Sequence, residues 1–161
     1  MAMRVGILTM SDAGSRGERV DTSGAAIREL MESIGAEVAR YAVVPDERDA
    51  IASTLREWCD GGAVDLVLTT GGTGLAARDV TPEATLDVAE RLAPGIAEAM
   101  RAAGMRATSM AMLSRAVAVV RGSTLIVNLP GSEKGVRESL AAIIDVLPHA
   151  VQLLRGDTEH R

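Results

Sequence analysis

The segment between residues 66 and 85 constrains the fold of this chain more than any other part. It begins with the apolar, β-branched run Leu66–Thr70, which is typical of a buried strand, and three glycines follow within four positions. Farther on, Thr81 has a side chain suited to an N-cap, and Pro82 suits the first position of a helix. The segment therefore predicts a strand, a glycine loop and a helix in succession.

The glycine loop is a candidate anion site. Gly71, Gly72 and Gly74, with Thr73 between them, can adopt positive φ and turn their amides toward a ligand. A simple tight turn is the structural alternative. A Walker A loop is excluded because its motif is absent. The stretch 72–77 does match a G-x-G-x-x-A dinucleotide pattern, although that motif opens directly into a helix and here the helix starts only at Pro82.

Strand and helix patterns alternate along the 161 residues, which predicts one α/β domain over 1–155 and a polar tail over 156–161. Such alternation favours a three-layer α/β sandwich with a mostly parallel central sheet. The expected strands are Val5–Met10, Val38–Val44, Val64–Thr70, Ala116–Val120 and Thr124–Leu129. The expected helices are one capped by Thr22 or Ser23, one capped by Asp46, one from Pro82 to Leu92, one after Pro94, and a last one that carries Val136–Leu147 and is kinked or ended by Pro148.

Composition excludes several classes of function. The net charge is −5 and the pI is about 5.1, whereas a general nucleic-acid binder is usually basic. No apolar run approaches the roughly 20 residues that span a bilayer, and no signal peptide follows Met1, so a cytoplasmic protein is expected. Cys59 is the single cysteine, which excludes a disulfide framework. An anionic substrate must then be held by local dipoles, selected basic residues or a metal.

Several polar residues directly follow expected strands. Ser11 and Asp12 follow the first strand, Asp46 follows the second, and the segments 71–79 and 130–132 follow two later ones. Ligands of open α/β sheets bind at the carboxyl ends of the strands. We therefore expect these residues to converge on one edge of the sheet.

Two aspartates are candidates for chemistry, and each has a structural alternative. Asp79 can be an ordinary turn residue that hydrogen-bonds its own backbone. A carboxylate beside a phosphate nest would repel the ligand unless it holds a cation, and Mg²⁺ resolves this conflict. For Asp46, the residues alone favour a helix cap.

Beyond these arguments, TTGGTG followed by RDVTPEAT resembles the signature of molybdenum-cofactor biosynthesis proteins of the MogA/MoaB type. That family includes molybdopterin adenylyltransferases and the related domain of gephyrin. The resemblance extends over nearly the whole chain, through LTMSDAGSRGERVDTSG, VVPDE, MLSR and STLIVNLPGS. Ala77, Val119 and Glu133 depart from the family pattern, which usually has Pro, Gly and Pro there.

The resemblance implies transfer of AMP from ATP to the terminal phosphate of molybdopterin, with Mg²⁺ held by catalytic Asp79 and Asp46. The substrate-binding residues that it implies, together with the loop argument, are Ser11, Asp12, Gly71, Gly72, Thr73, Gly74, Thr81, Ser114, Arg115, Pro130, Gly131 and Ser132. The adenylated product would pass to a molybdate-insertion enzyme. The alternatives are a non-catalytic molybdopterin-binding protein and a scaffold of the same fold.

The resemblance also implies a homotrimer. The residues give one hint, since the region 96–113 carries Met100, Met105, Met110 and Met112, and methionines suit adaptable contact surfaces. Packing of these methionines against the subunit's own sheet is the alternative, and the sequence by itself favours it.

Overall fold

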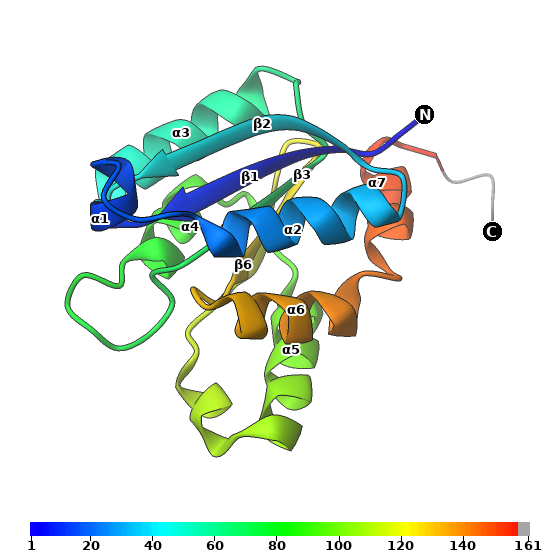
Figure 1. Cartoon of the computed structure of the whole chain (residues 1–161). Coiled ribbons are helices and arrows are strands. Elements are labelled where there is room, and N and C mark those ends of the chain that lie inside the picture. Colours follow the sequence, from blue (N-terminus) through cyan, green and yellow to red (C-terminus); the bar gives the residue numbers. More distant parts are fainter. Residues whose placement is uncertain (158–161) are drawn as a thin grey trace.

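The computed structural model describes residues 1–157, and all six of their strands join one sheet in the order β2-β1-β3-β6-β5-β4 (Figure 1). The strands are β1 (Arg4–Met10), β2 (Glu37–Val44), β3 (Leu66–Thr70), β4 (Arg91–Leu92), β5 (Ala118–Arg121) and β6 (Thr124–Leu129). β1 pairs in parallel with β2 and β3, and β3 pairs in parallel with β6. β5 and β4 continue the sheet in antiparallel fashion, so the predicted mostly parallel sheet is confirmed.

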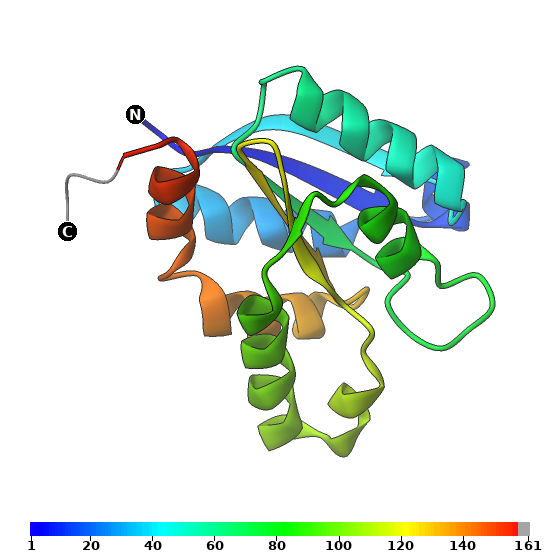
Figure 2. The same ribbon diagram turned by 180° about the vertical axis from the view of Figure 1, so that it is seen from behind.

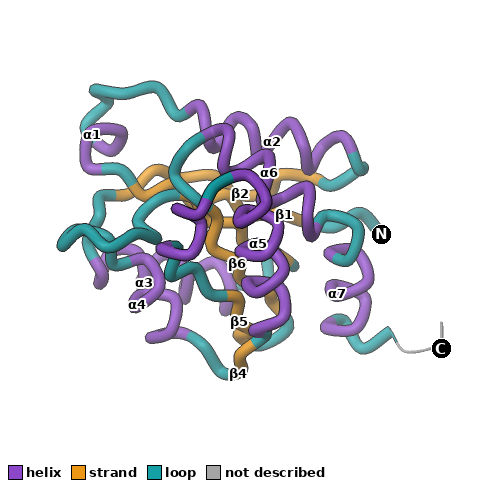
Figure 3. The backbone as a smooth tube through the Cα atoms, turned by 90° about the horizontal axis from the view of Figure 1, so that it is seen from below, coloured by secondary structure: helices purple, strands orange, loops and turns teal. Residues whose placement is uncertain are grey.

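Helices cover both faces of the sheet. They are α1 (Asp12–Ser15), α2 (Thr22–Ser33), α3 (Arg48–Asp60), α4 (Thr81–Val88), α5 (Pro94–Ala107), the 3-10 helix η1 (Ser109–Leu113), α6 (Glu133–Ile143) and α7 (Leu147–Leu154). Figures 2 and 3 show α3 and α4 on one face and α2, α5 and α6 on the other. The predicted three-layer sandwich is therefore confirmed.

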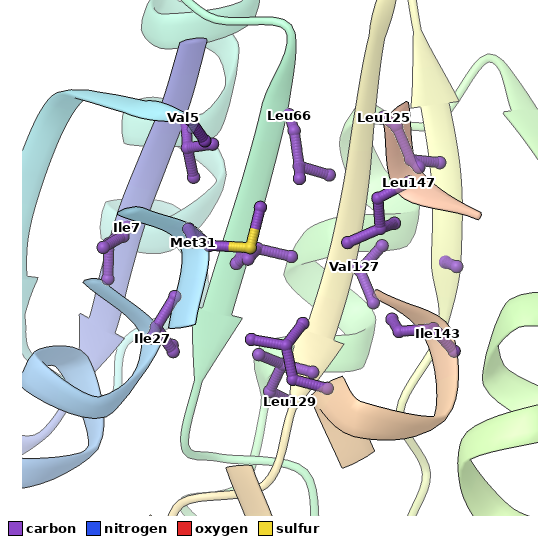
Figure 4. Close-up of a cluster of buried hydrophobic side chains, with 14 of the residues drawn as sticks. Val5, Ile7, Ile27, Met31, Leu66, Leu125, Val127, Leu129, Ile143 and Leu147 are labelled. Carbon is purple, nitrogen blue, oxygen red and sulfur yellow. The ribbon is translucent and has the colours of Figure 1, made fainter. Parts of the chain in front are cut away.

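Strand alternation builds two separate cores. On one face Ile7, Leu66 and Leu129 pack beneath α2 and α6 in a cluster of buried hydrophobic side chains (Figure 4). On the opposite face, side chains such as Leu8 and Ile126 pack against α3 and α4. Burying one such side chain stabilises the fold by roughly 1.5–3 kcal/mol, so the two aliphatic layers hold the sheet edge that carries the site.

The predicted cap of the first long helix is wrong. The N-cap of α2 is Asp21, whose Oδ1 accepts a hydrogen bond from Gly24 N at 2.9 Å, and not Thr22 or Ser23. The three residues are consecutive and all suit a cap, so only the entry angle of the chain decides among them.

Asp46 is not a cap either. Helix α3 begins after Glu47, which makes no side-chain cap hydrogen bond, because the Asp46 carboxylate is turned toward α1. Likewise Thr81 is the first residue of α4 and its N-cap is Val80, since the Thr81 hydroxyl is used by the glycine loop.

Helix ends also differ from expectation. Helix α4 stops at Val88 and not at Leu92, because Arg91–Leu92 pairs with β5 as the edge strand. The last helix is divided into α6 and α7, and Pro148 lies in the first turn of α7 instead of ending a helix. A proline is tolerated there because that amide has no partner within the helix.

Within residues 1–157 no helix is long and apolar enough to cross a membrane. Most of the expected tail, 158–161, lies outside the described residues. The N-terminus and α7 lie at the end of the molecule opposite α1 and the glycine loop (Figure 1).

Candidate active site

The topology of the sheet places a crevice between the carboxyl ends of β1 and β3. The chain adds β2 on one side of β1 and β3 on the other, which makes this position the switch point where α/β sheets bind ligands. A cavity of about 210 Å³ lies there. Its lining includes Ser11, Asp46, Gly71 and Gly72, with Asp79 and Gly131, and we call it the polar cavity. The predicted convergence of these strand ends is thus confirmed for six of the candidate residues.

A second cavity, of about 340 Å³, is also lined by the glycine loop. Thr73, Gly74 and Ser114, together with Pro130 and Ser132, line it, along with apolar side chains of α5 and η1 such as Met100 and Leu113. We call it the apolar cavity. Because Gly71 and Gly72 line one cavity and Thr73 and Gly74 the other, the glycine loop separates the two.

The glycine loop packs tightly against the loop at 130–132. A Cβ built on Gly131 would lie 3.4 Å from the Gly71 Cα atom. The Thr70 hydroxyl donates to the Pro130 carbonyl and the Ser23 hydroxyl to the Gly131 carbonyl, each at 2.6 Å. These contacts hold the loop at 130–132 against the glycine loop, the end of β3 and the start of α2.

Two glycines of the loop are sterically required. Gly71 has φ +99° and Gly72 φ +71°. A Cβ on Gly71 would lie 2.6 Å from the Met10 carbonyl oxygen, and one on Gly72 would lie 2.3 Å from Thr81 Oγ1. Positive φ and these close approaches together allow only glycine at both positions.

The four carbonyls of the loop are all held by the protein. Thr81 Oγ1 donates to the Gly71 carbonyl at 2.9 Å, and the Thr81 amide donates to the Gly72 carbonyl at 3.1 Å. Arg115 holds the next two, with its amide on the Thr73 carbonyl and its Nε on the Gly74 carbonyl, both at 2.8 Å. All loop carbonyls are therefore directed toward these two residues.

The amides that follow these carbonyls are free. In a trans peptide the N–H group points away from the preceding carbonyl, so the amides of residues 72–75 point away from Thr81 and Arg115. Among residues 1–157, none of these four N–H groups has a hydrogen-bond partner. The loop thus presents a row of donors and no acceptors, which is the arrangement of an anion-binding nest.

The Arg115 guanidinium is already occupied. Besides Gly74, it donates to the Asp79 carbonyl and to Glu83 Oε2, each at 2.6 Å. The hydrogen bond from Arg115 lowers the pKa of Glu83. Arg115 therefore holds the second half of the glycine loop and the turn at Asp79 in place, and its role in substrate binding stays a prediction.

Asp12 and Asp46 form a reciprocal pair. The Asp12 amide donates to Asp46 Oδ2 at 3.2 Å, and the Asp46 amide donates to Asp12 Oδ1 at 2.9 Å. Arg78 donates to both oxygens of Asp12, with a shortest distance of 2.7 Å, and this hydrogen bonding lowers the pKa of Asp12. Burial raises the pKa of Asp46, so a nearby cation would stabilise its ionised form.

Asp46 and Asp79 each keep one oxygen open. Asp79 Oδ2 accepts from the Ala76 amide at 3.0 Å, as an ordinary turn aspartate does, and Asp79 Oδ1 accepts no hydrogen bond within the described residues. Asp46 Oδ1 lies 3.4 Å from the position of a Cβ on Gly72 and is likewise open in this part of the chain. Residues 1–157 contain no group of three or more metal-ligating side chains. Two open carboxylate oxygens beside these free amides fit Mg²⁺, which proteins bind through one or two carboxylates together with substrate phosphates.

The three candidate serines have local structural roles. Ser11 caps α1 and Ser132 caps α6, each accepting from the amide three residues later. Ser114 Oγ accepts from the Ala116 amide at 3.3 Å. All three still line one of the two cavities.

Sequence reasoning missed Asp21. Its Oδ2 accepts from the Thr9 hydroxyl at 2.7 Å and from the Tyr41 hydroxyl, and burial, helped by this hydrogen bond, raises the pKa of Tyr41 to about 12. Asp21 also lines the polar cavity. The position of Asp21 directly before a helix indicated a cap, but Thr22 and Ser23 beside it suit a cap equally well.

This geometry defines an α/β domain in which a glycine loop with free amides separates two cavities. Residues 6–149 match the family model described as a probable molybdopterin binding domain. The chain belongs to this family, as its resemblance to the MogA/MoaB proteins predicted.

Similar proteins agree with this assignment. The molybdopterin adenylyltransferase of Helicobacter pylori J99 is 42% identical over 157 residues, which cover 96% of this chain and 89% of the relative. The solved structure of the molybdopterin biosynthesis enzyme MoaB from Thermus thermophilus is 59% identical, with a TM-score of 0.90 and coverage of 96% and 97%. Gephyrin of Dictyostelium discoideum is 41% identical over 94% of this chain, which corresponds to 22% of gephyrin.

Proposed function

We propose that this protein is a molybdopterin adenylyltransferase, which transfers AMP from ATP to the terminal phosphate of molybdopterin and releases pyrophosphate. The observation that carries the proposal is the row of four free amides at residues 72–75, placed between two cavities. A reaction that joins two phosphate-bearing molecules needs one anion site with room on both sides. The adenylyltransferase relative from H. pylori, similar over almost its full length, supports the same reaction.

In this mechanism an oxygen of the pterin phosphate attacks the α-phosphorus of ATP. The new P–O bond forms while the bond between the α-phosphorus and the bridging oxygen breaks, and pyrophosphate leaves with the electron pair. The free amides hold the phosphate groups in register, so positioning and charge neutralisation supply most of the catalysis. Mg²⁺, bound through the open oxygens of Asp46 and Asp79, would neutralise the charge that develops on the phosphates.

The test is a pyrophosphate-release assay with molybdopterin, ATP and Mg²⁺. Turnover that requires all three components is expected. Binding of molybdopterin by titration calorimetry without pyrophosphate release would instead favour the non-catalytic molybdopterin-binding alternative. A scaffold role would be indicated if neither substrate bound.

We also propose that the protein is a homotrimer and that its product passes to a molybdate-insertion enzyme, in a cytoplasmic pathway. Met100 is buried against the sheet, but Met105, Met110 and Met112 are 42–66% exposed along the projecting end of α5 and η1. The burial of Met100 agrees with the packing alternative, whereas the exposure of the other three supports a subunit contact. Of these three, Met110 also lines the apolar cavity, as Leu113 does.

A further inference from the structure

Arg19 lines the polar cavity and has no role in the proposed mechanism so far. Arg19 lies in the exposed segment between α1 and α2 and, among the described residues 1–157, is the only cation that lines the polar cavity. Within residues 1–157 its guanidinium has neither an ion pair nor a hydrogen bond. Three carboxylates, those of Asp21, Asp46 and Asp79, line the same cavity.

The other arginines near the site are committed to protein partners. Arg115 braces the glycine loop, and Arg78 binds both oxygens of Asp12. A nucleotide polyphosphate that enters a cavity with three carboxylates needs cationic partners in addition to backbone amides. In the described part of the chain, Arg19 is the one guanidinium on the cavity wall, and it can bind the polyphosphate without first breaking an ion pair.

We propose that Arg19 binds the pyrophosphate portion of the nucleotide, and this inference rests on the proposed adenylyl transfer. The α-phosphorus must lie where the two substrates meet, at the glycine loop between the cavities. The remaining phosphates then extend along the polar cavity, whose lining includes residues 19–23. Arg19 stabilises the negative charge that accumulates on pyrophosphate as the P–O bond breaks, as cations do in other phosphoryl transfers.

The same segment supplies a matched control. Arg16 lies three residues earlier and has the same charge, but its guanidinium binds Glu18 at 3.0 Å, and it does not line the cavity. Removing either arginine changes the net charge of the protein equally. Both residues are exposed, so neither change should disturb folding, and circular dichroism with thermal unfolding checks this.

The experiment measures dissociation constants of pyrophosphate, ATP and AMP by titration calorimetry. Arg19→Ala should weaken pyrophosphate and ATP about tenfold, which is the scale of one charge-assisted hydrogen bond, while AMP binding stays within about twofold. Arg19→Lys should have an intermediate effect and Arg16→Ala none.

Three results would overturn the assignment of Arg19. The first is unchanged pyrophosphate binding in Arg19→Ala, and the second is an equal loss of pyrophosphate affinity in Arg16→Ala. The third is a loss of AMP affinity in Arg19→Ala as large as the loss of pyrophosphate affinity, which would place the contact at the α-phosphate or at the phosphate of the other substrate. Wild-type protein that binds none of the three ligands would instead contradict the proposed function, and this inference with it.

Discussion

Asn128 links the sheet to the helix that follows the glycine loop, and its replacement by alanine should destabilise the whole domain. The side chain is fully buried in β6. Its Nδ2 donates to the hydroxyls of Thr69 in β3 and Thr85 in α4, both at 3.0 Å, and its Oδ1 accepts from the Val117 amide at 3.2 Å. Thr85 in turn donates to the Thr81 carbonyl at 2.8 Å.

The expected loss follows from these contacts. Asn128→Ala removes three hydrogen bonds, each with a net contribution of about 1 kcal/mol. It also leaves the Val117 amide without its acceptor and opens a small cavity between β3 and α4, so the penalty for unpaired buried groups adds about 1–2 kcal/mol. The free energy of unfolding should therefore fall by about 4 kcal/mol.

Equilibrium unfolding in urea, followed by circular dichroism, measures this loss. Thr85→Val is the matched variant, because it keeps the shape and removes only the hydroxyl, and it should cost about 1–2 kcal/mol. The two changes share one hydrogen bond, so the double variant should be less destabilised than the sum by about 1 kcal/mol. A loss below about 1 kcal/mol for Asn128→Ala, or strict additivity, would refute the reasoning.

Three further predictions address chemistry, pH and assembly. Asp79→Asn should lower turnover at least about a hundredfold in the pyrophosphate-release assay while circular dichroism stays unchanged, since the amide oxygen can still accept from Ala76 but the proposed Mg²⁺ ligand loses its charge. Near wild-type turnover would contradict the metal assignment. Burial alone would raise the pKa of Asp65, but hydrogen bonds from Arg155 and Arg4 hold it at about 2, below the ordinary value. A lowered folded-state pKa stabilises the fold above about pH 4, so the free energy of unfolding should fall by roughly 2 kcal/mol as the pH falls from about 5 to about 2. Urea unfolding of Asp65→Asn at the same pH values should not show this fall. Sedimentation equilibrium should give a trimer that Met112→Glu dissociates, and a wild-type monomer that still turns over would reject the trimer alone.

The architecture was predictable because burial patterns act over whole elements. Strands buried on both faces appear as continuous apolar runs, and the helices between them carry apolar residues at helical spacing, so the three layers followed without tertiary information. Element ends were less predictable. At Asp21, Thr22 and Ser23 three adjacent residues suit a cap, and at Arg91–Leu92 two residues join a sheet edge only because β5 lies beside them.

The composition of the site was predictable to a similar degree. Ligand position at strand ends follows from topology, and the sequence therefore indicated Ser11, Asp46 and the glycine loop together. The pairing of Asp46 with Asp12 was not predictable, because a local cap and a contact across 34 positions are equally compatible with one aspartate in the sequence. The absence of an ion pair at Arg19 within residues 1–157 was unpredictable for the same reason, since ion pairing depends on which carboxylates the fold brings near.

Glycines alone do not make the anion site, because a flexible loop can present carbonyls as easily as amides. Thr81 removes this ambiguity with two donors, using its hydroxyl and its amide to hold two consecutive carbonyls. Arg115, which is 41 positions from Gly74, does the same for the next two. The polarity of the loop thus depends on two residues outside it, and Thr81, the first residue of α4, uses its hydroxyl and its amide for the loop. A nest fixed in this way before the ligand arrives needs little reorganisation when the phosphates bind, which is the condition for strong electrostatic stabilisation of a developing charge.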